Sequence, residues 1–101
     1  MVRRMDPGNS ERVARLFEGH DSTEPPGLVG ATRRTLFRYQ DLYTHLIEAE
    51  QDILPRLLEA GDHPLFQQID RDLAPLLLPY DVDRPTLLQS RAEVFYSWER
   101  P

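Results

Sequence analysis

Two side chains near the middle of the chain, Arg34 and His45, are the first candidates for chemistry. A guanidinium is always charged and can hold an enolate or phenolate oxygen. An imidazole exchanges protons near neutral pH. The ordinary alternatives are a core histidine that only needs a hydrogen-bond partner and an arginine that is solvated or paired with a helix carboxylate.

A second pair, His20 and Asp21, directly precedes a proline-rich segment. Such neighbours can act as acid and base at a pocket mouth, because each group alters the proton affinity of the other. The alternative is ordinary polarity at a helix end, where a histidine complements the helix dipole. His63, which comes directly before Pro64, is interpreted as a helix-start residue rather than as part of a site.

The sequence carries no familiar catalytic signature. It has no nucleophile elbow, no phosphate loop, no dinucleotide fingerprint and no two histidines at the helical spacing of a metal site. It has no cysteine, which excludes disulfides, a thiol nucleophile and thiolate metal ligands. Any chemistry must therefore come from ionisable residues that the fold brings together.

The segment 30–48 is predicted to form a β-hairpin, because two runs of strand composition flank Gln40 and Asp41. A two-residue turn there predicts three opposing pairs: Tyr39 with Leu42, Phe37 with Thr44, and Leu36 with His45. Side chains alternate along a strand, so Arg34 and His45 become diagonal neighbours on one face. A loop one residue longer would place them on opposite faces.

The rest of the chain is divided by turn signals and by helical periodicity. The predicted elements are a short strand over 2–5, a helix from Asn9 or Ser10 to about Gly19, a stiff extended connection at Pro25-Pro26, a helix capped by Asp52 and stopped by Gly61, a helix over 62–77 bent or shortened by Pro75, a loop over 81–85 and a final strand over 93–98. The apolar faces expected in the core are Val13, Leu16 and Phe17; Ile53, Leu54, Leu57 and Leu58; and Leu65, Phe66, Ile69, Leu73, Leu76 and Leu77. This order predicts an α+β fold of the ferredoxin-like, split βαβ type.

Composition limits the class of protein. The 101 residues predict one domain over 1–101. A net charge of -5 argues against nucleic acid or an anionic membrane as the main partner. No apolar run approaches the length of a membrane helix and the amino terminus has no hydrophobic signal region, so a cytoplasmic protein is expected. Helices cover only one face of the predicted sheet, so a second subunit is expected on the other, giving a homodimer.

Several segments together resemble the small polyketide cyclases of actinomycete aromatic antibiotic pathways. They are Arg4-Met5-Asp6-Pro7, His20-Asp21-Ser22-Thr23-Glu24, Gly30 with 33–39, 41–48, His63-Pro64-Leu65-Phe66 and 92–98. The similarity runs in order over nearly the whole chain. It departs at the amino terminus, where relatives have several more residues, so either the first strand is short or the native start lies upstream. It also departs at Gly19 and Pro25, where relatives have a helix-compatible residue and a leucine.

The resemblance implies a dimeric ferredoxin-like α+β barrel with no metal or organic cofactor. It implies a pocket between sheet and helices that folds a poly-β-ketone for intramolecular aldol closure and dehydration, with possible transient contact with the polyketide synthase. By matching position, the catalytic residues fall on His20, Asp21, Arg34 and His45, and substrate contacts are expected from Leu36, Tyr43 and Phe66.

Roles follow from the chemistry of those groups. Arg34 is expected to stabilise an enolate or carbonyl oxygen, His45 to act as general acid, and Asp21, supported by His20, to act as general base.

Two other functions are compatible with the same barrel. One is a cofactor-independent monooxygenase acting on an aromatic polyketide, and the other is a non-catalytic polyketide-binding accessory protein.

Overall fold

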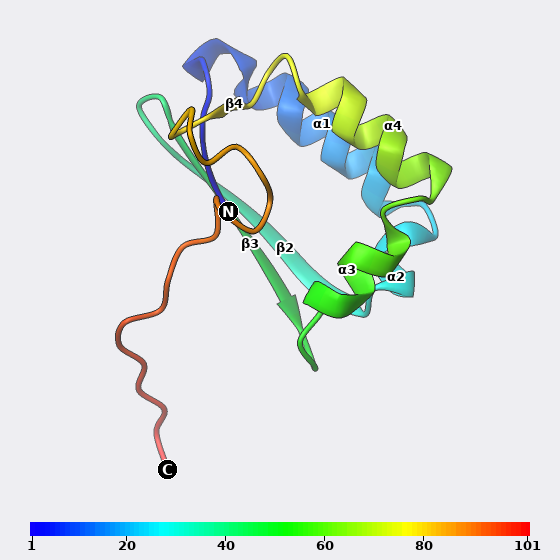
Figure 1. Ribbon diagram of the computed structural model, residues 1–101, viewed down its shortest axis with the longest axis vertical. Coiled ribbons are helices and arrows are strands. Elements are labelled where there is room, and N and C mark those ends of the chain that lie inside the picture. The colour runs from blue at the N-terminus through cyan, green and yellow to red at the C-terminus, as the bar shows by residue number, and fades with distance from the viewer.

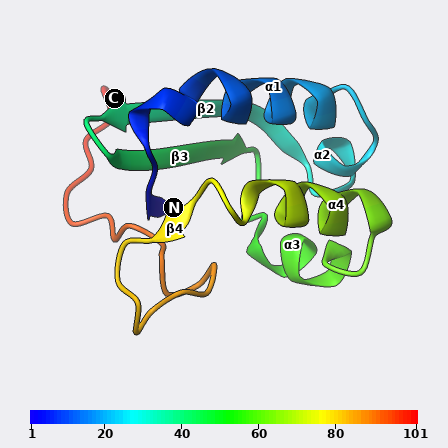
Figure 2. The same cartoon turned by 90° about the horizontal axis from the view of Figure 1, so that it is seen from above.

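A four-stranded antiparallel sheet carries the helices on one of its faces (Figures 1 and 2). The computed structural model describes all residues, 1–101. In chain order the elements are β1 (Val2–Arg4), a 3-10 turn (Pro7–Asn9), α1 (Ser10–Asp21), α2 (Pro25–Leu28), β2 (Ala31–Tyr39), β3 (Leu42–Ala49), α3 (Leu54–Ala60), α4 (Pro64–Leu73) and β4 (Leu78–Pro79).

The strand order across the sheet is β2-β3-β1-β4. Helices connect β1 to β2 and β3 to β4, while β2 and β3 form a hairpin. This is the split βαβ arrangement, so the predicted ferredoxin-like α+β fold is confirmed. None of the helices has the length and apolar character that a bilayer-spanning helix requires.

The central hairpin has the predicted register. Gln40 and Asp41 form the turn, and Gln40 has a φ of 52°, the left-handed conformation that tight hairpin turns require. Leu36 lies opposite His45, and Arg34 lies opposite Ile47. Arg34 and His45 therefore share the helix-facing side of the sheet, as the two-residue turn predicts.

The core lies between this face of the sheet and helices α1 and α4. Its buried members are Met5, Val13, Phe17, Tyr43, Ile69, Leu73 and Leu76. They come from the predicted stripes of both helices, from β3 and from the residue after β1, and each of the aliphatic, methionine and phenylalanine side chains contributes roughly 1.5–3 kcal/mol by leaving water. His63 begins α4, and its Nδ1 accepts a hydrogen bond from the Leu65 backbone N–H at 3.1 Å, so its interpretation as a helix-start residue is confirmed.

The predicted last strand is wrong. Residues 93–98 form no strand, and the carboxyl-terminal segment runs away from the body of the protein (Figure 1). The fourth strand is instead β4, only two residues long, directly after the leucine-rich end of α4. Strand composition alone does not make a strand, because a strand also needs a neighbour with which to pair, and this chain offers none to the segment.

The proline-rich connection and the helix ends also differ from expectation. Pro25 and Pro26 are not extended but open α2, where the missing N–H groups of a first turn cost nothing. Helix α1 continues past Gly19 to Asp21, and α4 ends at Leu73, short of Pro75. The extension of α1 to Asp21 places this carboxylate over the sheet, beside Arg34 of β2.

Helix α3 covers less than its sequence predicts. Gly61 ends it as expected, and the Asp52 carboxylate accepts a hydrogen bond from the Leu54 N–H at 3.1 Å. However, α3 contains no buried residue, and 61% of Leu58 is exposed. The helix therefore forms a peripheral wall rather than a part of the core.

Candidate active site

Arg34 is held on the helix-facing side of the sheet by contacts from two other elements. Its Nε lies 3.0 Å from both carboxylate oxygens of Asp21, and its Nη2 lies 2.9 Å from one of them. Its Nη1 lies 2.8 Å from Nε2 of His45. Its guanidinium carbon lies 4.5 Å from the centre of the Phe17 ring. The structure thus brings three of the four predicted catalytic residues into one contact network.

The guanidinium of Arg34 keeps two N–H donors that the protein does not use. A guanidinium has five N–H bonds in a rigid fork. Asp21 accepts from Nε and from Nη2, and His45 accepts from Nη1, which leaves one N–H on each Nη. Because 14% of the Arg34 side chain is exposed, the group is fixed in place yet not sealed off. Such donors suit an oxygen that gains negative charge during a reaction.

His45 is a neutral imidazole at neutral pH. Burial, the charge of Arg34 and the nearby amino terminus lower the pKa of His45 to about 3. Because Arg34 donates to Nε2, we assign the ring proton to Nδ1, for which the protein provides no acceptor. A neutral imidazole in this state donates a hydrogen bond to a carbonyl rather than giving up a ready proton.

The pKa of His45 predicts a loss of stability in mild acid. The pKa lies near 6.5 in the unfolded chain and near 3 in the folded protein, so between these values only the unfolded chain takes up the proton. The full stability is present above about pH 6.5 and is lost as the pH falls toward 3, by several kcal/mol at most, since one pKa unit is about 1.4 kcal/mol. Denaturant unfolding at pH 7 and pH 4.5 measures this loss. His45→Gln should reduce the pH dependence, and an unchanged dependence in this variant would contradict the assignment.

His20 lies at the edge of the network, in the last turn of α1. Its ring packs on Phe66 of α4, with 5.3 Å between ring centres, and only 8% of the residue is exposed. Burial and then Arg34 lower the pKa of His20, although Asp21 and Asp70 act in the opposite direction. This imidazole is therefore also neutral at neutral pH, and no protein group holds its ring nitrogens in a hydrogen bond.

Tyr43 supplies a buried hydroxyl without a partner. The residue is 1% exposed, and its hydroxyl makes no hydrogen bond in the protein. Burial raises the pKa of Tyr43, so the phenol stays neutral. An unsatisfied buried polar group costs about 1–3 kcal/mol, and it persists in native structures where it has a role or binds a water or a ligand.

Tyr43→Phe is therefore expected to raise the free energy of unfolding by about 1 kcal/mol or more, because it removes the unpaired hydroxyl and keeps the ring. Denaturant titration measures this change. Tyr80→Phe is the matched control, since 54% of Tyr80 is exposed and no change is expected there. A destabilised Tyr43→Phe variant would show that the hydroxyl already has a stabilising partner.

The three predicted substrate contacts lie around this network in the layer between sheet and helices. Leu36 packs on the core beside Tyr43, and Phe66 packs on His20. Phe17, which lies under the Arg34 guanidinium, was expected only as a core residue, and its helical spacing gave no sign of this second contact. No group of three or more histidine and acidic side chains is arranged to hold a metal ion.

The fold and the site together define a small ferredoxin-like α+β protein with a fixed arginine, a carboxylate and neutral imidazoles under a helical cover. The family model described as polyketide synthesis cyclase matches residues 1–99. The chain is 52% identical over 101 residues to tetracenomycin F2 cyclase of Streptomyces glaucescens. The aligned region covers 100% of this chain and 93% of that protein. The chain therefore belongs to the polyketide synthesis cyclase family, and it is a polyketide cyclase.

A solved structure supports the same assignment. The structure of tetracenomycin F2 cyclase, a type-II polyketide cyclase, matches with a TM-score of 0.93 over 100% of this chain and 95% of that one. The chain is also 36% identical over 104 residues to a protein named polyketide synthase CurG of Streptomyces cyaneus, with 99% of this chain and 94% of that protein covered. The resemblance seen in the sequence is confirmed.

Proposed function

We propose that the protein closes a ring of an aromatic polyketide by an intramolecular aldol reaction followed by loss of water. The observation that carries this proposal is the Arg34 guanidinium, which is fixed by Asp21 and His45 and keeps two free N–H donors. An aldol closure passes through an enolate and then an alkoxide, and a fixed cationic donor stabilises the charge that develops on the enolate oxygen.

Arg34 and His45 divide the oxygen atoms between them in this proposal. The free N–H groups of Arg34 hold the enolate oxygen, and the Nδ1–H of His45 donates to the acceptor ketone. The new carbon–carbon bond turns that ketone into an alkoxide, which takes up the proton that the general base removed, and the resulting hydroxyl then leaves as water together with a hydrogen from the neighbouring carbon. Because the imidazole is neutral, His45 polarises the acceptor by hydrogen bonding and is a weaker acid than an imidazolium.

The sequence led us to expect Asp21 as general base with support from His20, but His20 suits this role better. Asp21 has both carboxylate oxygens on Arg34, so accepting a proton would cost it that ion pair. His20 is neutral and has free ring nitrogens, and the carboxylates of Asp21 and Asp70 favour the imidazolium that forms when it accepts a proton. Asp21 then acts by orienting Arg34 and by stabilising His20.

Much of the acceleration is expected to come from shape. Poly-β-ketones cyclise in several ways without help, so the cavity must hold one folded arrangement with the reacting carbons in contact. Leu36, Tyr43 and Phe66 are expected to provide the apolar surroundings of this arrangement, since Leu36 and Tyr43 pack between sheet and helices and Phe66 packs on His20.

The homodimer is part of the proposal. The sheet face away from the helices carries large apolar side chains that are about half exposed or more, namely Phe37, Tyr39, Leu46 and Leu78. The nine-residue β2 forms an open edge of the sheet, which can pair with a strand from another chain. The exposed segment 92–101 has strand composition and no partner in its own chain. A second copy, with its sheet packed against this face to form a barrel, buries all three features.

The test is to incubate the purified protein with a poly-β-ketone from a polyketide synthase and to identify the product. A single ring skeleton whose mass is lower by one water, formed faster than with heat-denatured protein, is expected. Uptake of oxygen with a gain in mass would instead indicate a monooxygenase. Binding with recovery of unchanged ligand would indicate an accessory protein, and either result would contradict the proposal.

A further inference from the structure

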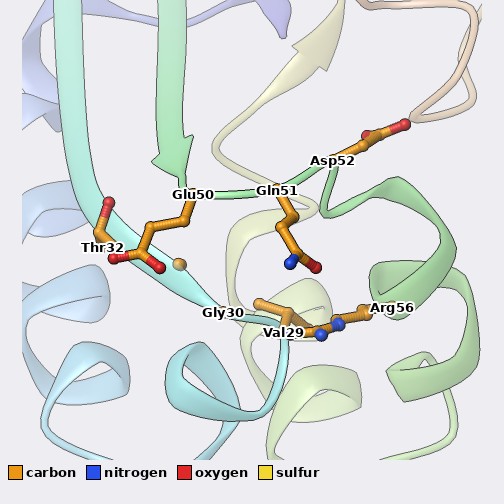
Figure 3. A pocket seen from close by; sticks show the side chains of 8 residues that line it. Val29, Gly30, Thr32, Glu50, Gln51, Asp52 and Arg56 are labelled. Carbon is orange, nitrogen blue, oxygen red and sulfur yellow. The ribbon is translucent and has the colours of Figure 1, made fainter.

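A polar cavity lies at the open end of the hairpin, outside the Arg34 contacts. It occupies about 380 Å³ between the ends of β2 and β3, the linker after β3, and α3 (Figure 3). This volume is within the range of small-molecule sites. None of the predicted site residues lines this cavity, so the proposed ring closure does not use it.

The cavity continues the layer that contains the active site. Ala31, which lines the cavity, lies opposite Ala49, and Arg34 lies opposite Ile47. Ala49 and Ile47 are two positions apart on β3, so all four side chains point to the helix-covered face, and the β-bulge at Thr32 absorbs the extra residue of β2. Two strand residues span about 7 Å, so the cavity begins one inward position beyond Arg34.

Arg56 of α3 is the one cation in the cavity. It makes no ion pair and no hydrogen bond within the protein. Its guanidinium lies over Gly30, where the position of a Cβ atom would be only 2.9 Å from Nη1, so the absence of a side chain at Gly30 makes room for it. The group therefore lies at the cavity with all its donors free.

The cavity offers acceptors as well as donors. Glu50 and Asp52 contribute carboxylates, while Arg56 and the Gln51 amide contribute N–H groups (Figure 3). A ligand with one type of charge would meet a repelling group here. A ligand that carries both carbonyl oxygens and hydroxyl groups, as a polyketide does in its keto and enol forms, can satisfy both kinds of partner.

We propose that this cavity binds the end of the polyketide that does not react, with Arg56 donating to a carbonyl or phenol oxygen and Glu50 accepting from a hydroxyl. The inference rests on the proposed function. It makes Arg56 a residue that selects and orients the substrate, while ring closure takes place at Arg34 and His45.

The experiment compares Arg56→Ala and Glu50→Gln with Arg71→Ala, an exposed arginine on α4 that does not line the cavity. Binding is measured by titration with a polyhydroxylated anthraquinone and with unsubstituted anthracene, which has the same rings but no oxygen, and turnover is measured with the poly-β-ketone. Arg56→Ala is expected to raise Kd for the hydroxylated probe and KM about tenfold, with kcat within about twofold, because it removes charged hydrogen bonds used equally in the bound and reacting states. Glu50→Gln should also raise Kd for the hydroxylated probe and KM, but by less than Arg56→Ala does.

The outcomes separate the two proposals. Normal turnover by the native protein, together with identical Kd and KM for Arg56→Ala and Arg71→Ala, would overturn the role of Arg56 and leave the cyclase proposal intact. Absence of turnover by the native protein, with weaker probe binding by Arg56→Ala, would overturn the cyclase proposal and leave the binding site. An equal loss of affinity for the unsubstituted probe would show that Arg56 contributes only to packing, and would also overturn the inference.

Discussion

Replacing Arg34 with alanine is expected to lower turnover by about 10- to 1000-fold, the range found when one fixed donor to a developing negative charge is removed. The loss should fall mainly on kcat, because the free N–H donors act on charge that appears during ring closure. Arg34→Lys should also lose most of the turnover. A lysine ammonium keeps the charge, but it cannot contact Asp21 and His45 and still present two parallel N–H groups.

Arg15→Ala is the control for this experiment. Arg15 lies on α1, where it pairs with Glu11 at 3.9 Å and its side chain is 79% exposed. Its turnover should stay within about twofold of the native value, because exposed ion pairs contribute little. Thermal unfolding of each variant shows whether the protein still folds when Asp21 and His45 have lost their contact with Arg34. A folded Arg34→Ala variant with native turnover would remove Arg34 from the mechanism.

The second large effect is expected from the carboxyl-terminal segment. If the protein is the proposed homodimer, removing residues 92–101 should convert it into a monomer that aggregates, because the open edge and the apolar face of the sheet then lose their cover. A finer test replaces Phe95 and Trp98, which are 96% and 67% exposed in the isolated chain, with serine. Sedimentation velocity at several protein concentrations measures the change of mass.

Glu93 and Glu99, in the same segment, provide the control when both are changed to serine. This variant should remain a dimer, because it keeps the apolar side chains that a second copy would bury. Leu46→Asp, on the exposed sheet face, tests the other part of the interface and should also favour the monomer. A native protein that sediments at 11.8 kDa at every concentration would contradict the homodimer proposal.

The part of the fold set by local geometry was predictable from the sequence. The two-residue turn at Gln40 and Asp41 determines the register of the hairpin, and the register alone determines that Arg34 and His45 share a face. The helical stripes of α1 and α4 were likewise predictable, since their period matches the helix.

The parts that depend on distant partners were not predictable. Residues 93–98 have the composition of a strand, but the chain itself provides no neighbour for them, whereas Leu78 and Pro79 pair with β1 despite a weak strand signal. Composition reports how well a side chain suits a sheet, and pairing decides whether the sheet forms.

The sequence predicted which residues form the site better than it predicted their pairing and protonation. The sequence raised the pairing of Arg34 with a helix carboxylate as the alternative to a catalytic role, and the structure contains that pair beside the His45 contact. The neutral state of His45 follows from burial and from Arg34, which no spacing rule supplies. Arg56 carried no signal at all, because its place depends on how α3 lies against Gly30.

A crystal structure of the protein with a bound aromatic product of ring closure tests the roles of Arg34 and His45. We expect product oxygens within hydrogen-bond distance of the Nη atoms of Arg34 and of Nδ1 of His45, with Asp21 still paired to Arg34. A product bound elsewhere, with the Arg34 guanidinium and the His45 imidazole contacting only protein or solvent, would contradict the proposed mechanism.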